Sequence, residues 1–208
     1  MGDKMNEFKY EVKNIVKDDD VYKRIINKSY RENPNISLDD LVYIKLNYYN
    51  FDNEIVEGEI IVNKLIKDET VNIFKELFEN KYQINSIKLI EDFWLGDGVS
   101  SDENSIKHNN SSSFCYREIP RKKKLSYHAR GLAIDINPRQ NPYIMFVDDK
   151  PDYSIFDEEE EFFAKNRQGD HVITHDDICY KIFTKYGFEW GGDWDKPIDY
   201  QHFQKDVI

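Results

Sequence analysis

Apolar residues follow two different periods in this chain, and the change from one to the other limits the folds open to it. From Val42 to Tyr48 every second residue is a large apolar one, which is the period of a strand with one buried face. From Ile66 to Phe78 the apolar residues instead recur three and four positions apart, which predicts a helix with one apolar stripe. The two patterns together predict an α+β fold, a single mixed domain with helices packed on a mainly antiparallel sheet.

The same signals place the other elements. We expect strands at residues 59–62, 84–90, 132–136 and 200–204, and helices at residues 21–30, from Ser37 onward, and at residues 175–186 behind a Thr174 cap. Residues 96–117 are rich in Gly, Ser, Asn and Asp, which favour turns, and therefore predict a long loop. The acidic residues 148–161 predict a solvated loop.

The length of 208 residues suits one domain, which we divide into an N-terminal helical arm packed on the core, residues 1–40, and a main domain, residues 41–208. Hydrophobic residues make up 39% of the chain, enough for a core, and the net charge of −11 argues against a nucleic acid as partner. No apolar run approaches the roughly 20 residues that cross a bilayer. We therefore expect no transmembrane segment, and we expect a monomer.

Two histidines and one aspartate stand where the chain can bring them together. Between Ser126 and Asp135, Gly131 permits a tight turn, so that His128 in the turn and Asp135 on the next strand can point into one pocket. His202 lies on the last expected strand. Two imidazoles and one carboxylate are a familiar ligand set for zinc, and three protein ligands leave the fourth position open. We predict one zinc per chain, held by these three residues in a surface cleft.

Charged and aromatic residues beside these ligands are candidates for catalysis and substrate binding. Asp199 precedes the last ligand by three positions and is expected to act as general base. Arg117 follows the expected long loop and is expected to bind a substrate carboxylate or a developing oxyanion. Ser126 and Trp194 are expected to contact the substrate, with Trp194 lining the cleft.

Two other pairs of residues are expected to have structural roles. His171 and His175 have the i,i+4 spacing of a metal pair, but the expected Thr174 cap places His171 before the helix. Cys115 and Cys179 form neither a CxxC pair nor a disulfide framework, so packing is their expected role.

The motifs together resemble those of a known family. The segment SYHARGLAID resembles the SxHxxGxAxD signature of zinc-dependent peptidoglycan peptidases related to D-alanyl-D-alanine carboxypeptidases, a group that includes phage L-alanyl-D-glutamate endolysins. EWGGDW and DYQHF are similar to the WGGDW and (D/E)xxH elements of that group, with Asp199 at the acid and His202 at the last ligand. SSSFCYR resembles the segment that supplies its substrate arginine, here Arg117. The likeness covers about residues 40–208.

The resemblance implies zinc-dependent hydrolysis of an amide bond in the stem peptides of bacterial peptidoglycan. It leaves open whether the chain acts as a D-alanyl-D-alanine carboxypeptidase or as an L-alanyl-D-glutamate endopeptidase. A non-catalytic zinc-containing binding module on the same scaffold is the alternative.

Two departures from the family pattern leave the substrate preference open. Cys115-Tyr116-Arg117 stands where the family has Asn-Cys-Arg, and residues 148–161 are unusually acidic. The start of the chain lacks the apolar stretch of a secretion signal. We expect an extracellular or cell-wall location with an export signal removed, or otherwise a cytoplasmic phage-type lysin.

Overall fold

The fold consists of short strands and α-helices. The computed structural model describes residues 7–119 and 124–207. Its helices are α1 (Asp20–Ile25), α2 (Lys67–Glu79), α3 (Gly98–Lys107), α4 (Glu158–Asn166) and α5 (Ile178–Lys185). Its strands are β1 (Tyr10–Asn14), β2 (Leu41–Tyr49), β3 (Ile55–Asn63), β4 (Ser86–Ile87), β5 (Asn110–Ser111), β6 (Ala133–Asp135), β7 (Tyr143–Val147), β8 (Lys150–Asp152), β9 (Glu189–Trp190), β10 (Ile198–Asp199) and β11 (His202–Gln204).

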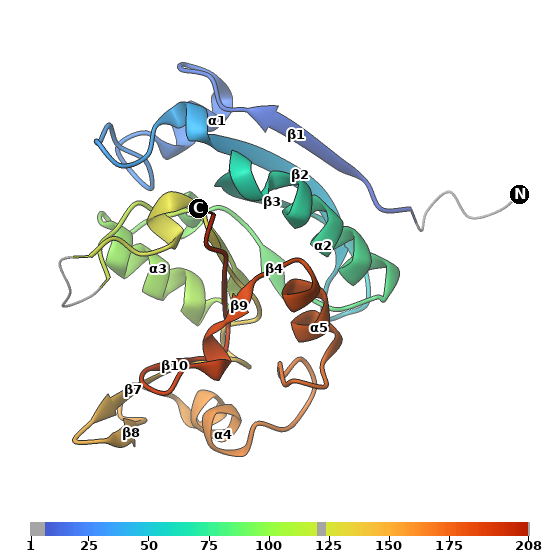
Figure 1. Cartoon of the computed structure of the whole chain (residues 1–208), viewed down its shortest axis with the longest axis vertical. Coiled ribbons are helices and arrows are strands. Elements are labelled where there is room, and N and C mark those ends of the chain that lie inside the picture. Colours follow the sequence, from blue (N-terminus) through green and yellow to red (C-terminus); the bar gives the residue numbers. More distant parts are fainter. Residues whose placement is uncertain (1–6, 120–123, 208) are drawn as a thin grey trace, which may run out of the picture.

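Strand pairing is mainly antiparallel, as predicted, and the α+β class is confirmed (Figure 1). The single sheet that we expected is divided into three sheets, in the orders β1-β2-β3, β6-β11-β9 and β10-β7-β8, and a parallel pair, β4-β5. The reason is strand length, because β2 and β3 each span 9 residues while the strands of the second half span only 2 to 5. Several small sheets therefore take the place of one large sheet.

The two periods seen in the sequence form one layer of sheet and one layer of helix. β2 and β3 pair along their whole length, from Leu41 opposite Asn63 to Tyr49 opposite Ile55. Helix α2 lies against this sheet, and α5 packs beside α2 (Figure 1). The buried face of α2 includes Phe74, which confirms the predicted apolar stripe.

The segment before residue 40 differs in part from the prediction. It contributes a strand, β1, which pairs with β2 and has mostly exposed side chains, so that no apolar alternation marks it in the sequence. Helix α1 ends at Ile25 because Ile26 is extended, short of the predicted end at residue 30. Ser37 starts only a three-residue 3-10 turn. The division of the chain at residue 40 stays a prediction.

The predicted long loop at residues 96–117 is wrong, because helix α3 occupies much of it. The carboxylate of Asp97 caps this helix by accepting hydrogen bonds from the backbone of Val99 and Ser100 at 2.9 Å. The buried residues of α3 are polar, namely Ser101, Asp102 and Ser105. A helix whose buried face is polar has no apolar period, so the composition alone suggested turns.

The predicted solvated loop at residues 148–161 is also wrong, since it contains β8 and the start of α4. Arg139 neutralises that start, with its Nη2 atom 2.8 Å from Asp157 and 2.7 Å from Glu159.

Helix α5 begins later than predicted, at Ile178, because Asp177 and not Thr174 caps it. The strand predicted at residues 84–90 is reduced to β4.

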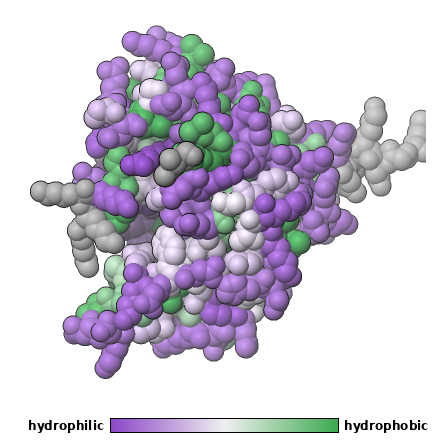
Figure 2. Space-filling view, in the orientation of Figure 1, coloured by the Kyte–Doolittle hydropathy of each residue, from purple (hydrophilic) through white to green (hydrophobic). Residues whose placement is uncertain are grey.

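Hydrophilic residues cover most of the face shown in Figure 2, and hydrophobic residues form small separate groups on it. No helix in the described part of the chain is both long enough and apolar enough to span a membrane.

One hydrophobic core joins the N-terminal sheet to the strands of the second half. Its buried residues include Ile44 of β2, Phe74 of α2, Ile134 of β6, Phe183 of α5 and Phe203 of β11. The rings of Phe183 and Phe203 stack at 4.1 Å. β6 and β11 are therefore anchored on their apolar side, which leaves their other side chains free to build a site.

A tight turn before β6 rests on the end of β3. The 3-10 turn His128–Arg130 ends at Gly131, which has a left-handed backbone with φ of 66°. The backbone amide of Asn63 donates to the carbonyl of Gly131 at 2.8 Å, and its side-chain amide donates to the carbonyl of Arg130 at 3.0 Å. The N-terminal sheet thus fixes the turn that carries His128.

Gly131→Ala should lower the free energy of unfolding more than Gly187→Ala does. Both glycines are left-handed, a conformation that costs an L side chain about 1–2 kcal/mol. A Cβ atom at position 131 would lie 2.7 Å from the backbone nitrogen of Asn63, whereas one at position 187 would lie 3.7 Å from the flexible end of Lys205. Urea unfolding of both variants measures the difference, and equal losses would show that the turn does not depend on this close approach.

Candidate metal centre

Three predicted ligands from three separate elements converge. His128 lies on the turn before β6, Asp135 ends β6, and His202 begins β11, directly opposite Asp135 in the antiparallel pair. The Nε2 atom of His128 lies 3.1 Å from Nδ1 of His202 and 3.2 Å from Oδ1 of Asp135. The last two atoms are 3.0 Å apart. All three side chains are buried, and the ligand atoms lie within 4.8 Å of one another.

Each histidine makes a hydrogen bond through the ring nitrogen that faces away from the other two ligands. This bond determines which ring nitrogen carries the lone pair. Nδ1 of His128 lies 2.6 Å from the carbonyl oxygen of Ser113, which makes this nitrogen the donor. Nε2 of His202 lies 3.1 Å from Oε1 of Gln204, and the amide nitrogen of Gln204 points to Glu189. In neutral imidazoles with these tautomers, both inner nitrogens are acceptors. Sequence reasoning missed Ser113 and Gln204.

The convergence of three acceptors fits a cation. Two imidazole lone pairs and a carboxylate oxygen face one another, and no hydrogen bond among them is possible without an added proton. Although burial favours the neutral imidazole, the charge of Asp135 raises the pKa of His128. Although burial favours the neutral acid, the facing histidines hold the pKa of Asp135 well below its usual range. The site therefore favours positive charge, and its donor set suits zinc.

The predicted base lies next to these ligands. Asp199 ends β10, pairs with Tyr143 of β7, and places Oδ2 4.0 Å from Nδ1 of His202. Its Oδ1 atom is buried and has no hydrogen-bond partner in the described chain. Burial, with a smaller contribution from the charge of Asp135, raises the pKa of Asp199 to about 7 in the metal-free protein, against the opposing effect of His202.

The glycines of the WGGDW segment explain how Asp199 reaches this position. A Cβ atom on Gly191 would lie 2.5 Å from the carbonyl oxygen of Asp199, and one on Gly192 would lie 2.3 Å from the ring of Trp190. Side chains at these positions would push the segment away from β10. Trp190 is buried in the core.

Arg117 reaches the same region from the segment after β5. Its Nη2 atom forms a buried ion pair with Oδ2 of Asp102 at 2.5 Å, and its Nε atom is buried without a hydrogen-bond partner in the described chain. Although burial favours the neutral form, the charges of Asp102, Asp135 and Asp199 raise the pKa of Arg117. Asp102 was missed because its helix, α3, was predicted as a loop.

The two predicted substrate contacts flank the ligands. The hydroxyl of Ser126 accepts a hydrogen bond from the backbone amide of His128 at 3.2 Å, so it stabilises the turn. The half-buried ring of Trp194 lies 5.3 Å from the ring of His202. Their roles toward a substrate stay predictions.

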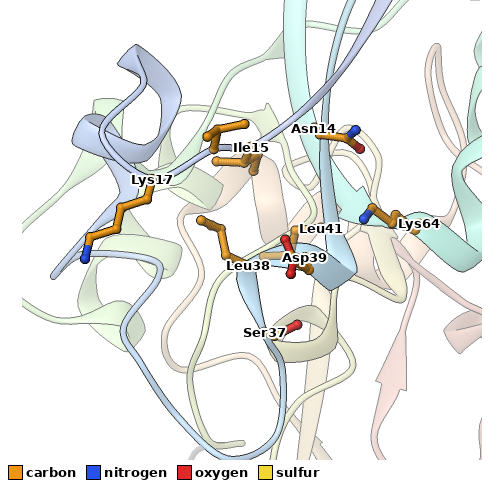
Figure 3. A pocket seen from close by; sticks show the side chains of 9 residues that line it. Asn14, Ile15, Lys17, Ser37, Leu38, Asp39, Leu41 and Lys64 are labelled. Atoms are coloured by element: carbon orange, nitrogen blue, oxygen red, sulfur yellow. The ribbon is translucent and has the colours of Figure 1, made fainter.

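The remaining histidines and cysteines lie apart from this cluster. His171 stacks on Phe51 at 3.7 Å, and His175 contacts Asp193 at 2.6 Å. Cys115 and Cys179 are free and buried. A pocket of about 450 Å³ between the end of β1 and the start of β2 contains none of the predicted site residues, and Lys17 and Lys64 stand on opposite sides of it (Figure 3).

Zinc should stabilise the chain, and His202→Ala should abolish that effect. A ligand that binds only the folded state at 100 times its dissociation constant adds about 2.7 kcal/mol to the free energy of unfolding. Thermal unfolding with and without zinc measures the shift. His175→Ala should keep it, because this exposed histidine lies outside the cluster. An unchanged zinc effect in His202→Ala would contradict the assigned ligand set.

Comparison with known proteins agrees with the motifs. A search of curated proteins gave no match, and a search of solved structures gave none either. Residues 120–205 match the family model described as D-alanyl-D-alanine carboxypeptidase. This stretch contains the three candidate ligands and Asp199. Over residues 120–205, the chain is therefore similar to the D-alanyl-D-alanine carboxypeptidase family of peptidases.

Proposed function

We propose that this chain is a zinc metallopeptidase that hydrolyses an amide bond in the stem peptides of bacterial peptidoglycan. The observation that carries the proposal is the convergence of three potential ligand atoms, from His128, Asp135 and His202, beside the buried carboxylate of Asp199. The family match supports a peptidase in general. The zinc dependence and the cell-wall substrate are more specific proposals than the peptidase class. They rest on the donor set and on the motif resemblance.

His128, Asp135 and His202 would hold the zinc ion. When bound, zinc supplies a Lewis acid that polarises the scissile carbonyl and makes water at the site more acidic. Asp199 accepts the proton of the attacking water and later donates it to the leaving amine. A base whose pKa lies near neutral pH can perform both transfers, and the burial of Asp199 moves its pKa in that direction.

Arg117 binds the charge that the substrate brings or develops. Asp102 pairs with the guanidinium at Nη2, while Nε has no hydrogen-bond partner among the described residues. A substrate carboxylate or the oxyanion of the reacting carbonyl would give that buried donor an acceptor. Asp102 holds the guanidinium in place during this contact.

The bond that is cut can be a terminal D-alanyl-D-alanine bond, the bond to a D-alanine that remains after trimming, or the internal L-alanyl-D-glutamate bond. Mass spectrometry of digested muropeptides distinguishes these products by their mass. We propose that the chain works at the cell wall as a monomer, after export or as a phage-type lysin.

Asp199→Asn should keep zinc and lose hydrolysis. The amide cannot accept a proton, and removal of a general base typically lowers kcat by about 100- to 10 000-fold. Muropeptide hydrolysis and metal analysis measure the two effects in the same preparation. Asp193→Asn is the matched control, because Asp193 is an exposed aspartate of the same segment that contacts His175. Full activity of Asp199→Asn would exclude the proposed mechanism.

A zinc-loaded wild-type chain that cleaves no muropeptide of any wall type would instead favour a binding module. Asp199 argues against that alternative, since a module that only binds has no use for a buried base.

Arg117→Lys should lower kcat/KM while zinc is retained. Lysine keeps the charge but lacks the planar fork, and the loss of a hydrogen bond to a charged group costs about 1.5–3 kcal/mol. A rise in KM would indicate a substrate carboxylate, and a fall in kcat would indicate the oxyanion. Arg130→Lys, at an exposed arginine whose side chain makes no contact described above, is the control. An unchanged kcat/KM in Arg117→Lys would remove Arg117 from the site.

A further inference from the structure

Among the residues that the structure describes, Oδ1 of Asp199 has no hydrogen-bond partner. Its Oδ2 atom is 4.0 Å from Nδ1 of His202, which is too far for a hydrogen bond. The backbone must therefore set its position. That backbone is the short segment from Asp199 to His202, which carries both the proposed base and a proposed ligand, with Tyr200 and Gln201 between them.

Within this segment, Tyr200 contacts both Arg167 and Trp190. The Cζ atom of Arg167 lies 3.7 Å from the centre of its ring, and the ring of Trp190 lies 5.8 Å away. The indole nitrogen of Trp190 donates to the carbonyl of Tyr200 at 2.8 Å. The two contacts hold the ring and the backbone of Tyr200.

Arg167 is itself fixed in one orientation. It ends α4 in a left-handed conformation. Its guanidinium donates to the carbonyl of Gln140 at 3.0 Å, the side-chain oxygen of Asn141 at 3.1 Å and the carbonyl of Ile173 at 2.8 Å. Within residues 7–119 and 124–207 no carboxylate pairs with it, and burial lowers the pKa of Arg167 to about 10. A half-buried cation without an acid is costly, so its donors and planar face must contribute to the fold.

The residues that bind Arg167 belong to a hydrogen-bond network that connects β6 with the segment before β11. Gln140 and Asn141 follow β6, which ends in Asp135. The buried side chain of Asn141 donates to the carbonyl of Asn137 at 3.0 Å, and the amide of Ile136 donates to the carbonyl of Gln201 at 3.0 Å. The guanidinium thus ties the loop after one ligand to the residue that follows the proposed base.

We propose that Arg167 is a positioning residue that orients Asp199 and His202 through the ring of Tyr200. The inference rests on the proposed function and adds to it a residue outside the recognised motifs. Arg167 acts through geometry, since the charges that act most on Asp199 are those of His202, Asp135, Asp102 and Arg117. Lysine at position 167 would keep the charge and lose the fork.

Arg167→Lys tests the proposal in the full chain, with Arg139→Ala as the matched control. Arg139 anchors the other end of α4 through Asp157 and Glu159 and has no contact with Tyr200. We expect Arg167→Lys to bind zinc and to lose about 10- to 100-fold in kcat with little change in KM, since small misplacements of a catalytic group cost that much. Arg139→Ala should keep its kcat. Unchanged kcat in Arg167→Lys, or an equal loss in Arg139→Ala, would overturn the proposal.

A second pair of variants keeps the test valid if position 167 proves essential for folding. Tyr200→Phe retains the ring face and should retain kcat, whereas Tyr200→Leu removes it and should lose kcat as Arg167→Lys does. Equal activity of the two Tyr200 variants would overturn the proposal.

The visible absorption of the cobalt(II)-substituted chain separates this inference from the proposed function. Arg167→Lys and Tyr200→Leu should change the spectrum, because His202 shifts, while Tyr200→Phe and Arg139→Ala should not. An unchanged spectrum in Arg167→Lys would overturn the inference. If the unchanged chain cleaves no muropeptide, the proposed function fails, and the spectra still decide the role of Arg167.

Discussion

Buried negative charge is the constraint on which the site depends. Three carboxylates, those of Asp102, Asp135 and Asp199, are buried in this region, and the largely buried guanidinium of Arg117 pairs with Asp102. Isolated ions are expensive to bury, so two of these negative charges need further compensation. Burial raises the pKa of Asp199 to about 7, which reduces this excess of negative charge. A divalent cation between the imidazoles would compensate the charge completely, in agreement with the orientation of their lone pairs.

The scaffold holds these groups by backbone contacts between distant segments. The β6–β11 pair sets His202 opposite Asp135, and the hydrogen bonds between Asn63 and the Gly131 turn fix His128. Gly191 allows the closing segment to approach Asp199. Each of these contacts requires a small residue or an exposed backbone group at one position. This requirement explains in physical terms why glycines stand between the functional residues of the two motifs.

Local patterns predicted the elements whose buried faces are apolar, and they predicted that the two histidines and the aspartate of the short motifs lie close together. Helix α2 and the alternation in β2 are of this kind. Helix α3 could not be predicted, because it buries serines and Asp102, and β1 could not, because its side chains are mostly exposed. Asp102, like Ser113 and Gln204, meets its partner across distant parts of the chain. No spacing in the sequence marks such a contact.

The acidic segment is the part of the chain for which the sequence was most misleading. Its charge suggested a solvated loop, yet Arg139 pairs with the first turn of α4 and Arg167 ends that helix. The acids of the first turn also suit a helix N-terminus, where the backbone carries partial positive charge. The segment can therefore fold as a helix in spite of its charge. Arg167, which caps the C-terminal end of this helix, then contacts the ring of Tyr200, the residue that follows the proposed base.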